Sequence, residues 1–368
     1  IQSNEADNLH VSLTLNNYLN KAKKQIDENY DSWDYMKRYT NPYEFIHTIV
    51  PNTKVSVSKM KPLSRSFYKM IEMVNMFHLF SGFNDEPINT FHLAEGPGGF
   101  IEATQHLRKN ENDKYYGMTL MDDDPNVPGW KKSNHFLETH KNVKIERGIT
   151  GTGDLMEVAN LKYCNDTYKN SMNIITADGG FDFSIDFNKQ EILATNLLLA
   201  QVSFAISMQK VGGHFILKIF DIFTKTTCDL MYILSSLYKQ VYIVKPNTSR
   251  LANSEKYIVC KGFKKYPDKL ISNIILNYES LKTSEFISRI LKNNLDYFYL
   301  NKIEEYNAIF GQQQIENINS TLNLISCKNK NDKLDTLKKN NIQKCTAWCE
   351  KNNISYNKNL ASANVFIL

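Results

Sequence analysis

Short strand-like segments alternate with amphipathic helical stretches through the middle of the chain, and this alternation restricts the fold more than any other feature. Between the strand-like segments, the stretches 188–208 and 228–238 carry leucine and isoleucine at mainly helical spacing. Strands that alternate with helices predict an α/β fold built on a largely parallel sheet. The segments that we predict as strands are 90–95, 115–121, 143–146, 173–178, 214–219, 241–245 and 256–260.

The last two predicted strands are joined only by the polar loop 246–255. That loop is too short for the crossover that parallel strands require, so we expect these two strands to pair antiparallel. A seven-stranded mixed sheet of this kind, with helices on both faces, resembles the Rossmann-like sheet of class I methyltransferases. We therefore predict an α/β domain over 61–266, with helical extensions at 1–60 and 267–368.

Composition argues against several other classes of protein. Hydrophobic residues make up 42% and aromatic residues 12% of the chain, which is the usage of a globular protein and not of a disordered one. No stretch approaches the roughly 18 uncharged apolar residues of a membrane helix, so we expect a soluble protein without a membrane partner. The six cysteines form no C-x-x-C pair, so we expect reduced thiols and no metal site.

The charge balance leaves the partner open. A net charge of +5 is compatible with a polyanionic partner but too small to demonstrate one. Much of the excess is local, because six lysines stand between Lys328 and Lys344 against only Asp332 and Asp335. This basic stretch is either a solvated helix face or a surface that faces RNA.

The segment 91–100, which reads FHLAEGPGGF, is the most informative motif. A hydrophobic strand runs directly into a glycine-rich turn and then into a helix, so Gly96, Gly98 and Gly99 leave room for a ligand at the helix N-terminus. Glu95 can accept a hydrogen bond from a cationic amine. A dinucleotide site would instead require G-x-G-x-x-G and no carboxylate in the turn, which disfavours a dehydrogenase. The alternative is a plain glycine turn between strand and helix.

The turn EGPGGF is similar to the methionine-binding turn of FtsJ-type RNA ribose 2′-O-methyltransferases. Further segments follow in the order of that family, and the resemblance extends over roughly 61–265. They are GMTL at 117–120, GTGDL at 151–155, ADGGFD at 177–182, GGHFILKIFD at 212–221 and KPNTSRLANSEKYIVCKGF at 245–263.

Within the family, these motifs look most like the branch that methylates the messenger RNA cap to cap-1. The flanks and composition resemble methyltransferases of large cytoplasmic DNA viruses, which implies a location in the host cytoplasm or the virion. A cellular cap methyltransferase would instead be nuclear.

The resemblance implies a catalytic tetrad of Lys69, Asp178, Lys218 and Glu255. Asp178 and Lys218 close parallel strands and Glu255 opens the antiparallel one, so we expect these three charges to meet at the carboxyl ends of the strands. Only the resemblance brings Lys69 to them. Our hypothesis is that Lys218 accepts the proton, Lys69 tunes it and steadies the incipient alkoxide, and the two carboxylates orient the lysines.

The resemblance also implies S-adenosylmethionine as methyl donor. Its methionine half is expected on the turn, and its adenosine near the two following motifs. An acidic residue after the second strand often holds the ribose hydroxyls, and the sequence leaves open which of three adjacent aspartates does so. Asp154 is equally well explained as the cap of a helix that begins at Leu155. The expected donor-binding residues are Glu95, Gly96, Pro97, Gly98, Gly99, Phe100, Thr119, Leu120, Asp154 and Asp178, with Asp122, Asp123 or Asp124 at the ribose.

RNA, most simply the capped 5′ end of messenger RNA, is the partner implied. We expect phosphate contacts around the rim from Arg65, Arg250 and Lys261. With 20 Tyr and 20 Phe, the sequence does not single out a residue that stacks on the cap. Proteins of the capping machinery could contact the extensions. The alternatives are methylation of ribosomal or transfer RNA, and a non-catalytic RNA-binding module with the same fold.

Overall fold

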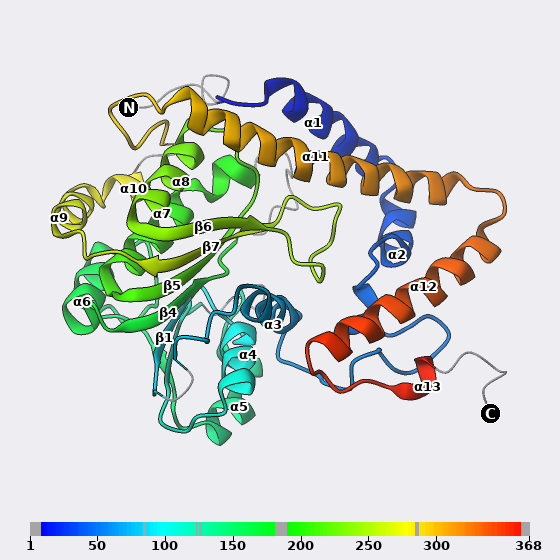
Figure 1. Ribbon diagram of the computed structural model, residues 1–368, viewed down its shortest axis with the longest axis horizontal. Helices are drawn as coiled ribbons and strands as arrows, with labels where there is room; N and C mark the ends of the chain where they lie inside the picture. The colour runs from blue at the N-terminus through cyan, green and yellow to red at the C-terminus, as the bar shows by residue number, and fades with distance from the viewer. Residues whose placement is uncertain are drawn as a thin grey trace.

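A computed structural model describes residues 9–83, 86–122, 124, 127–180, 190–283 and 287–361. Its centre is a seven-stranded sheet in the order β3-β2-β1-β4-β5-β7-β6, in which β7 alone runs antiparallel to its neighbours. Figure 1 shows this sheet surrounded by helices, with a second group of helices beside it. The strands are β1 Asn89–Leu93, β2 Lys114–Met118, β3 Val143–Glu146, β4 Met172–Ala177, β5 Gln209–Ile219, β6 Tyr238–Val244 and β7 Lys256–Phe263.

The predicted class I methyltransferase topology is confirmed, including the antiparallel hairpin of β6 and β7. Two strand starts differ from the prediction by more than one residue. β5 begins at Gln209 instead of residue 214, because Gln209 pairs with Met172 before the glycines interrupt the register. β6 begins at Tyr238, which we had assigned to the preceding helix, and its buried ring packs on Phe263 of β7.

Helices cover both faces of the sheet, as predicted. Because successive side chains of a strand point to opposite faces, each inner strand supplies two cores. On β5, Ile216 joins the core beneath one group of helices, whereas Phe215 and Leu217 join the core beneath the other. The first group contains α3 Ser66–Phe77 and α4 Gly99–Arg108, with η3 Trp130–Lys132 and α5 Asn134–Thr139 further along; the second contains α6 Val158–Tyr168, α7 Gln190–Met208 and α8 Lys225–Leu237.

Helix α7 corrects one expectation from the sequence. By length and composition alone it is apolar enough to cross a membrane, although we had expected no such segment. In the fold, 72% of that apolar window is buried against the sheet and the neighbouring helices, as is typical of a core helix. Its carboxylate Glu191 is also buried and accepts hydrogen bonds from the backbone N–H groups of Phe223 and Thr224.

The predicted helical extensions pack on each other as well as on the domain (Figure 1). Helix α11 lies along α1 and crosses α2, and α12 contacts α2 and the short turn η2. The side-chain amide of Asn317 on α11 donates to the carbonyl of Thr40 at the end of α2. The elements are α1 Leu13–Asp27, α2 Tyr30–Thr40 and η2 Glu44–Ile46 before the domain, and α9 Asp268–Asn277, α10 Ser280–Thr283, α11 Tyr297–Ser326, α12 Lys330–Lys351 and α13 Lys358–Ala361 after it.

Candidate active site

Two lysine–carboxylate pairs meet at the carboxyl ends of β4 and β5. Lys69 on α3 places its Nζ 2.7 Å from Oε1 of Glu255, which directly precedes β7. Lys218, near the end of β5, lies 3.5 Å from Oδ1 of Asp178 and donates to the Asp178 carbonyl at 2.7 Å. The convergence that strand topology predicts for three of these charges is confirmed. Lys69, which only the resemblance had placed, joins them from the helix that covers this face.

Tyr257 links the two pairs, and sequence reasoning missed it. Its hydroxyl donates to Oδ1 of Asp178 at 2.8 Å and accepts a hydrogen bond from the Lys69 ammonium at 3.3 Å. Burial raises the pKa of Tyr257 well above its ordinary value, and the nearby charges of Asp178 and Glu255 add to that effect. The hydroxyl therefore stays protonated. The two-residue period of a strand could have pointed to Tyr257. Residues two apart in extended chain share a face, and Tyr257 follows Glu255 by two.

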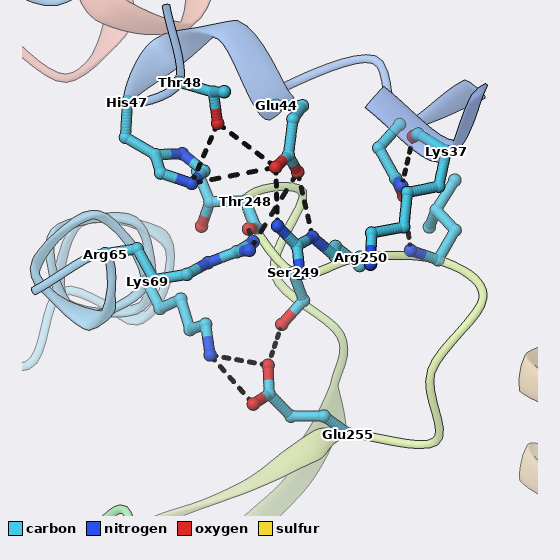
Figure 2. A network of polar contacts seen from close by, with 12 residues as sticks. Lys37, Glu44, His47, Thr48, Arg65, Lys69, Thr248, Ser249, Arg250 and Glu255 are labelled. Atoms are coloured by element: carbon cyan, nitrogen blue, oxygen red, sulfur yellow. Dashed lines mark hydrogen bonds and ion pairs between the residues drawn. The ribbon is translucent and has the colours of Figure 1, made fainter. Parts of the chain in front are cut away.

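The charges around Glu255 keep it ionised. Burial alone would raise its pKa, but the ammonium groups of Lys69 and Lys218 outweigh burial and hold the pKa of the Glu255 carboxyl below its ordinary value. The hydroxyl of Ser249 donates a further hydrogen bond to it, as Figure 2 shows. The side chains of the two pairs are 8–16% exposed, so the site is narrow yet reachable from solvent.

The glycine-rich turn after β1 lies beside this site, and its glycines are required by the protein's own packing. Gly98 has a φ of +109°, a conformation that L side chains rarely adopt. A Cβ on Gly99 would clash with the hydroxyls of Ser64 and Ser66. We had expected Gly99 to be glycine because a missing side chain leaves room for a ligand. The structure gives another reason, since a side chain at Gly99 would clash within the protein. The turn instead lets the chain enter α4 close against residues 64–66.

Glu95 caps the helix that follows the turn. Its Oε1 accepts hydrogen bonds from the backbone N–H groups of Phe100 at 2.7 Å and Ile101 at 3.0 Å. Burial raises the pKa of Glu95 to about 8, although these two donors oppose the shift. A cation beside this carboxyl would therefore favour its ionised form. A cationic amine is the partner that the sequence suggested for Glu95.

A cleft of about 340 Å³ opens next to the carboxyl ends of β2 and β3. Leu120 and Asp122 line it, together with Trp130 and Arg147. Asp122 accepts a hydrogen bond from the N–H of Asp124, and Asp123 lies outside the described residues. Apolar walls with a carboxylate at the edge suit a purine nucleoside, and the volume is within the range of small-molecule sites.

Asp154 and Thr119 lie beneath this region. Oδ1 of Asp154 accepts a hydrogen bond from the N–H of Met156, and the next helix begins only at Val158. The proposed helix start at Leu155 was therefore wrong, and Asp154 closes a turn ahead of α6. Thr119 is buried, and its carbonyl packs directly against Gly153. The motifs GMTL and GTGDL are thus side by side in space.

The model of the family described as FtsJ-like methyltransferase matches residues 62–263. The chain belongs to this family. It is similar to human cap-specific mRNA (nucleoside-2′-O-)-methyltransferase 1, with 34% identity over 234 residues that cover 61% of this chain and 27% of that protein.

Two further relatives carry similar names. The enzyme named methyltransferase 1 from Trypanosoma brucei brucei is 28% identical over 71% of this chain and 72% of its own length. Methyltransferase 2 from Pongo abelii is 28% identical over 90% of this chain and 44% of its own length. The aligned region thus spans about a quarter of the human relative, and the resemblance to the FtsJ type is confirmed.

The loop before β7 of the FtsJ-like domain is held by residues on both sides of its boundary. Glu72 on α3 accepts hydrogen bonds from the backbone N–H groups of Asn247 and Thr248. Glu44, outside the domain, forms an ion pair with Arg250 at 2.7 Å (Figure 2). The loop carries Ser249, so these contacts position the donor that reaches Glu255.

The three expected RNA contacts have different positions. Arg65 and Arg250 lie near the rim and share the carboxylate of Glu44, at 3.9 Å and 2.7 Å. Arg65 also donates to the carbonyl of Thr248 at 2.9 Å. Lys261 pairs in register with His214, away from the carboxyl end of β5. Its Nζ donates to the carbonyl of Phe77. The expectation that Lys261 lies around the rim was wrong, because β7 runs antiparallel and carries Lys261 away from the carboxyl ends of the parallel strands.

Proposed function

We propose that this chain transfers a methyl group from S-adenosylmethionine to a ribose 2′-hydroxyl of RNA, at the first transcribed nucleotide of capped messenger RNA. The observation that carries the proposal is the pairing of Lys69 with Glu255 and of Lys218 with Asp178 beside the glycine-rich turn. Two lysine amines and two carboxylates fixed at one rim suit the handling of a single proton next to a donor site. Membership in the FtsJ-like family supports the same reaction class.

In this proposal the donor lies across the turn and the neighbouring cleft. Glu95 is the partner for its cationic amino group, Asp122 for the ribose hydroxyls, and the walls at Leu120 and Trp130 for the purine. When bound, the donor supplies a methyl group on a positively charged sulfonium, which is a good leaving group. The protein therefore mainly has to position the hydroxyl and remove its proton.

The proton is taken up by the lysines of the tetrad. We assign Lys218, in its neutral form, as the group that accepts the proton of the 2′-hydroxyl. Asp178 fixes the Nζ of Lys218 through its carbonyl and its carboxylate. Lys69 supplies positive charge as the oxygen becomes more negative, and Glu255 together with the Tyr257 hydroxyl holds that ammonium in place.

The capped substrate is the finer part of the proposal. It rests on the similarity to these three relatives, each of which is named a cap-specific enzyme. Ribosomal or transfer RNA as substrate, and a non-catalytic RNA-binding role, are the competing possibilities.

Transfer of labelled methyl from S-adenosylmethionine to matched capped and uncapped RNAs tests the proposal. We expect label only in capped RNA, and nuclease digestion should recover it as 2′-O-methylated first nucleotide. Equal labelling of uncapped ribosomal or transfer RNA would contradict the cap assignment. RNA binding without any transfer, in a protein that binds the donor, would contradict the catalytic assignment.

A further inference from the structure

A groove of about 920 Å³ lies between α3 of the FtsJ-like domain and the C-terminal half of α12. The side chains of Asn75, His78 and Asn247 line it from the domain, and those of Lys344 and Lys351 line it from α12. A hydrogen bond joins the two walls, from the Nδ2 of Asn75 to Oδ1 of Asn352 at 2.9 Å. Figure 1 shows the end of α12 beside α3. The groove therefore joins the domain to the extension that follows it.

The groove is positively charged. Lys344 and Lys351 are seven residues apart, which is about two helical turns, so both point to the same side of α12. Both are exposed, and neither has an ion-pair partner among the residues that the structure describes. The one carboxylate in the wall, Glu72, is buried and accepts hydrogen bonds from the loop at Asn247 and Thr248. The net effect favours an anionic ligand.

The rest of the lining suits nucleotides. The exposed imidazole of His78 offers a flat surface on which a base can stack, and the partly buried rings of Tyr43 and Phe80 also line the groove. The amide of Asn353 and the hydroxyl of Ser81 offer hydrogen bonds. Sites for single-stranded nucleic acid usually combine lysines that attract the phosphates with aromatic rings that stack on the bases.

The groove is connected to the tetrad through shared residues. Glu72 lies one helical turn beyond Lys69 on α3. Asn247 lines the groove, and Ser249, two residues further on, donates to Glu255. One loop thus forms a wall of the groove on one side and supports the catalytic carboxylate on the other. The groove and the tetrad are therefore adjacent, with this loop between them.

We propose that this groove binds a single-stranded segment of the RNA substrate away from the methylated nucleotide, with Lys344 and Lys351 contacting its phosphates. This inference rests on the proposed function for the nature of the substrate. The segment is the RNA body and not the cap, because the positively charged methylguanine of a cap would find no free carboxylate in the described lining, where Glu72 is buried and already accepts hydrogen bonds from the loop. It also assigns part of the basic stretch 328–344 to RNA, namely Lys344.

The test compares two double variants with the same loss of charge. Lys344→Ala/Lys351→Ala removes the groove lysines. Lys328→Ala/Lys339→Ala is the matched control, since both control residues are exposed and lie outside the groove lining. Lys339 precedes Lys344 by five residues, which places it on the far side of α12. The probes are a long uncapped single-stranded RNA and the cap dinucleotide m7GpppG, each titrated at several salt concentrations by fluorescence anisotropy and calorimetry.

The groove variant should bind the long RNA more weakly, with a salt slope smaller by about 1.4, since each single-strand phosphate contact contributes roughly 0.7. Its affinity for m7GpppG and its unfolding midpoint should not change. The control variant should match the wild type throughout. Equal salt slopes for the groove variant and the wild type would overturn the proposal and leave the groove for a protein partner. Selective loss of m7GpppG binding would overturn it in favour of a cap site.

Methyl transfer separates this inference from the proposed function. An altered salt slope in a protein that methylates no RNA would contradict the proposed reaction and leave the groove as an RNA site. Normal transfer to a short capped RNA, with unchanged binding of the long RNA, would contradict the groove alone. Lys351→Glu provides a second variant, for which we expect a larger loss of RNA affinity than for Lys351→Ala.

Discussion

Two charge clusters lie where β5 ends and β7 begins, and they differ in what surrounds them. In the tetrad, two lysines face two carboxylates, and three of the four residues are partly exposed. In the second cluster, Asp221 binds Lys256 and Lys23 at 3.2 Å each, and all three residues are buried. Lys23 comes from α1, outside the FtsJ-like domain. The first cluster faces a site, whereas the second fastens an extension to the domain.

The alternation of β7 separates these two roles. Glu255 and Tyr257 point toward α3 and the tetrad, and Lys256 between them points to the opposite side, where its ammonium lies 5.9 Å from the Phe310 ring of α11. Residues 255–257 thus alternate between the side of the proposed catalytic site and the side of the buried ion-pair cluster. Substitutions in the two clusters should therefore have separable effects on rate and stability.

The largest effect is expected from Lys218→Ala, with a loss of about 10²–10⁴-fold in methyl transfer, because the proposed proton acceptor is removed. Donor affinity and the unfolding midpoint should stay unchanged. Lys210→Ala is the control, since Lys210 is exposed at the other end of the same strand. Single-turnover kinetics with saturating donor gives the measurement. A folded Lys218→Ala protein with full turnover would remove the centre of the mechanism.

Adding Lys69→Ala to Lys218→Ala should cost little more turnover than either substitution alone, because we propose that the two lysines act on one proton. Multiplied effects of the single variants would instead indicate that the lysines act independently.

In the second cluster, Asp221→Ala should lower the free energy of unfolding by about 3–5 kcal/mol, because it leaves two buried ammonium groups without a carboxylate. Urea unfolding measures the change, and Asp332→Ala on exposed α12 is the control. Turnover per folded molecule should change far less than in Lys218→Ala. Normal stability combined with lost turnover would assign Asp221 to the chemistry and break the comparison.

Glu44 lies between the two cases, since its carboxylate is buried but its partner Arg250 is one-third exposed. Burial raises the pKa of Glu44, but Arg250 and Arg65 outweigh it and lower that pKa to about 2. Glu44→Gln should therefore cost about 1–3 kcal/mol of stability near neutral pH. A carboxylate with a lowered pKa contributes above its ordinary pKa, so the difference should shrink as pH falls from about 4.5 to about 2. Urea unfolding across that range measures it, and a difference independent of pH would exclude the ion pair as its source.

The smallest effect is expected from Tyr257→Phe, which keeps the ring and removes the hydroxyl that joins the two pairs. The loss of one hydrogen bond to a charged group predicts a rate reduction of roughly tenfold. Tyr115→Phe is a matched control, since its buried hydroxyl also donates to a carboxylate, Asp113, at the edge of the sheet away from the tetrad. Equal turnover of Tyr257→Phe and the wild type would show that the two pairs act without the bridge.

The sheet was predictable because its strands are short, apolar and separated by clear helical patterns. The first residue of each strand was less predictable, and Tyr238 illustrates why. It continues the helical spacing of Leu234 and Leu237, and only packing on Phe263 decides that it belongs to a strand. The preceding sequence does not contain that information.

The site was predictable as far as strand topology reaches. Asp178, Lys218 and Glu255 follow from the ends of strands, and Lys69 required the family resemblance. The contact of Glu44 with Arg250 joins residues 206 positions apart across the domain boundary, and no local pattern signals it. For the same reason, the two arginines looked like free RNA contacts in the sequence.

The pairing of the extensions has a consequence for synthesis on the ribosome. Leu15 of α1 packs against Gly311 of α11, and Trp33 of α2 packs against Ile318. At about 5–20 residues per second, α11 leaves the ribosome roughly a quarter of a minute to a minute after α1. Throughout that interval Leu15 and Trp33 lack their partners on α11. The nascent chain is therefore expected to need a chaperone at its early helices, and a ribosome-release pulse followed by crosslinking would detect it there.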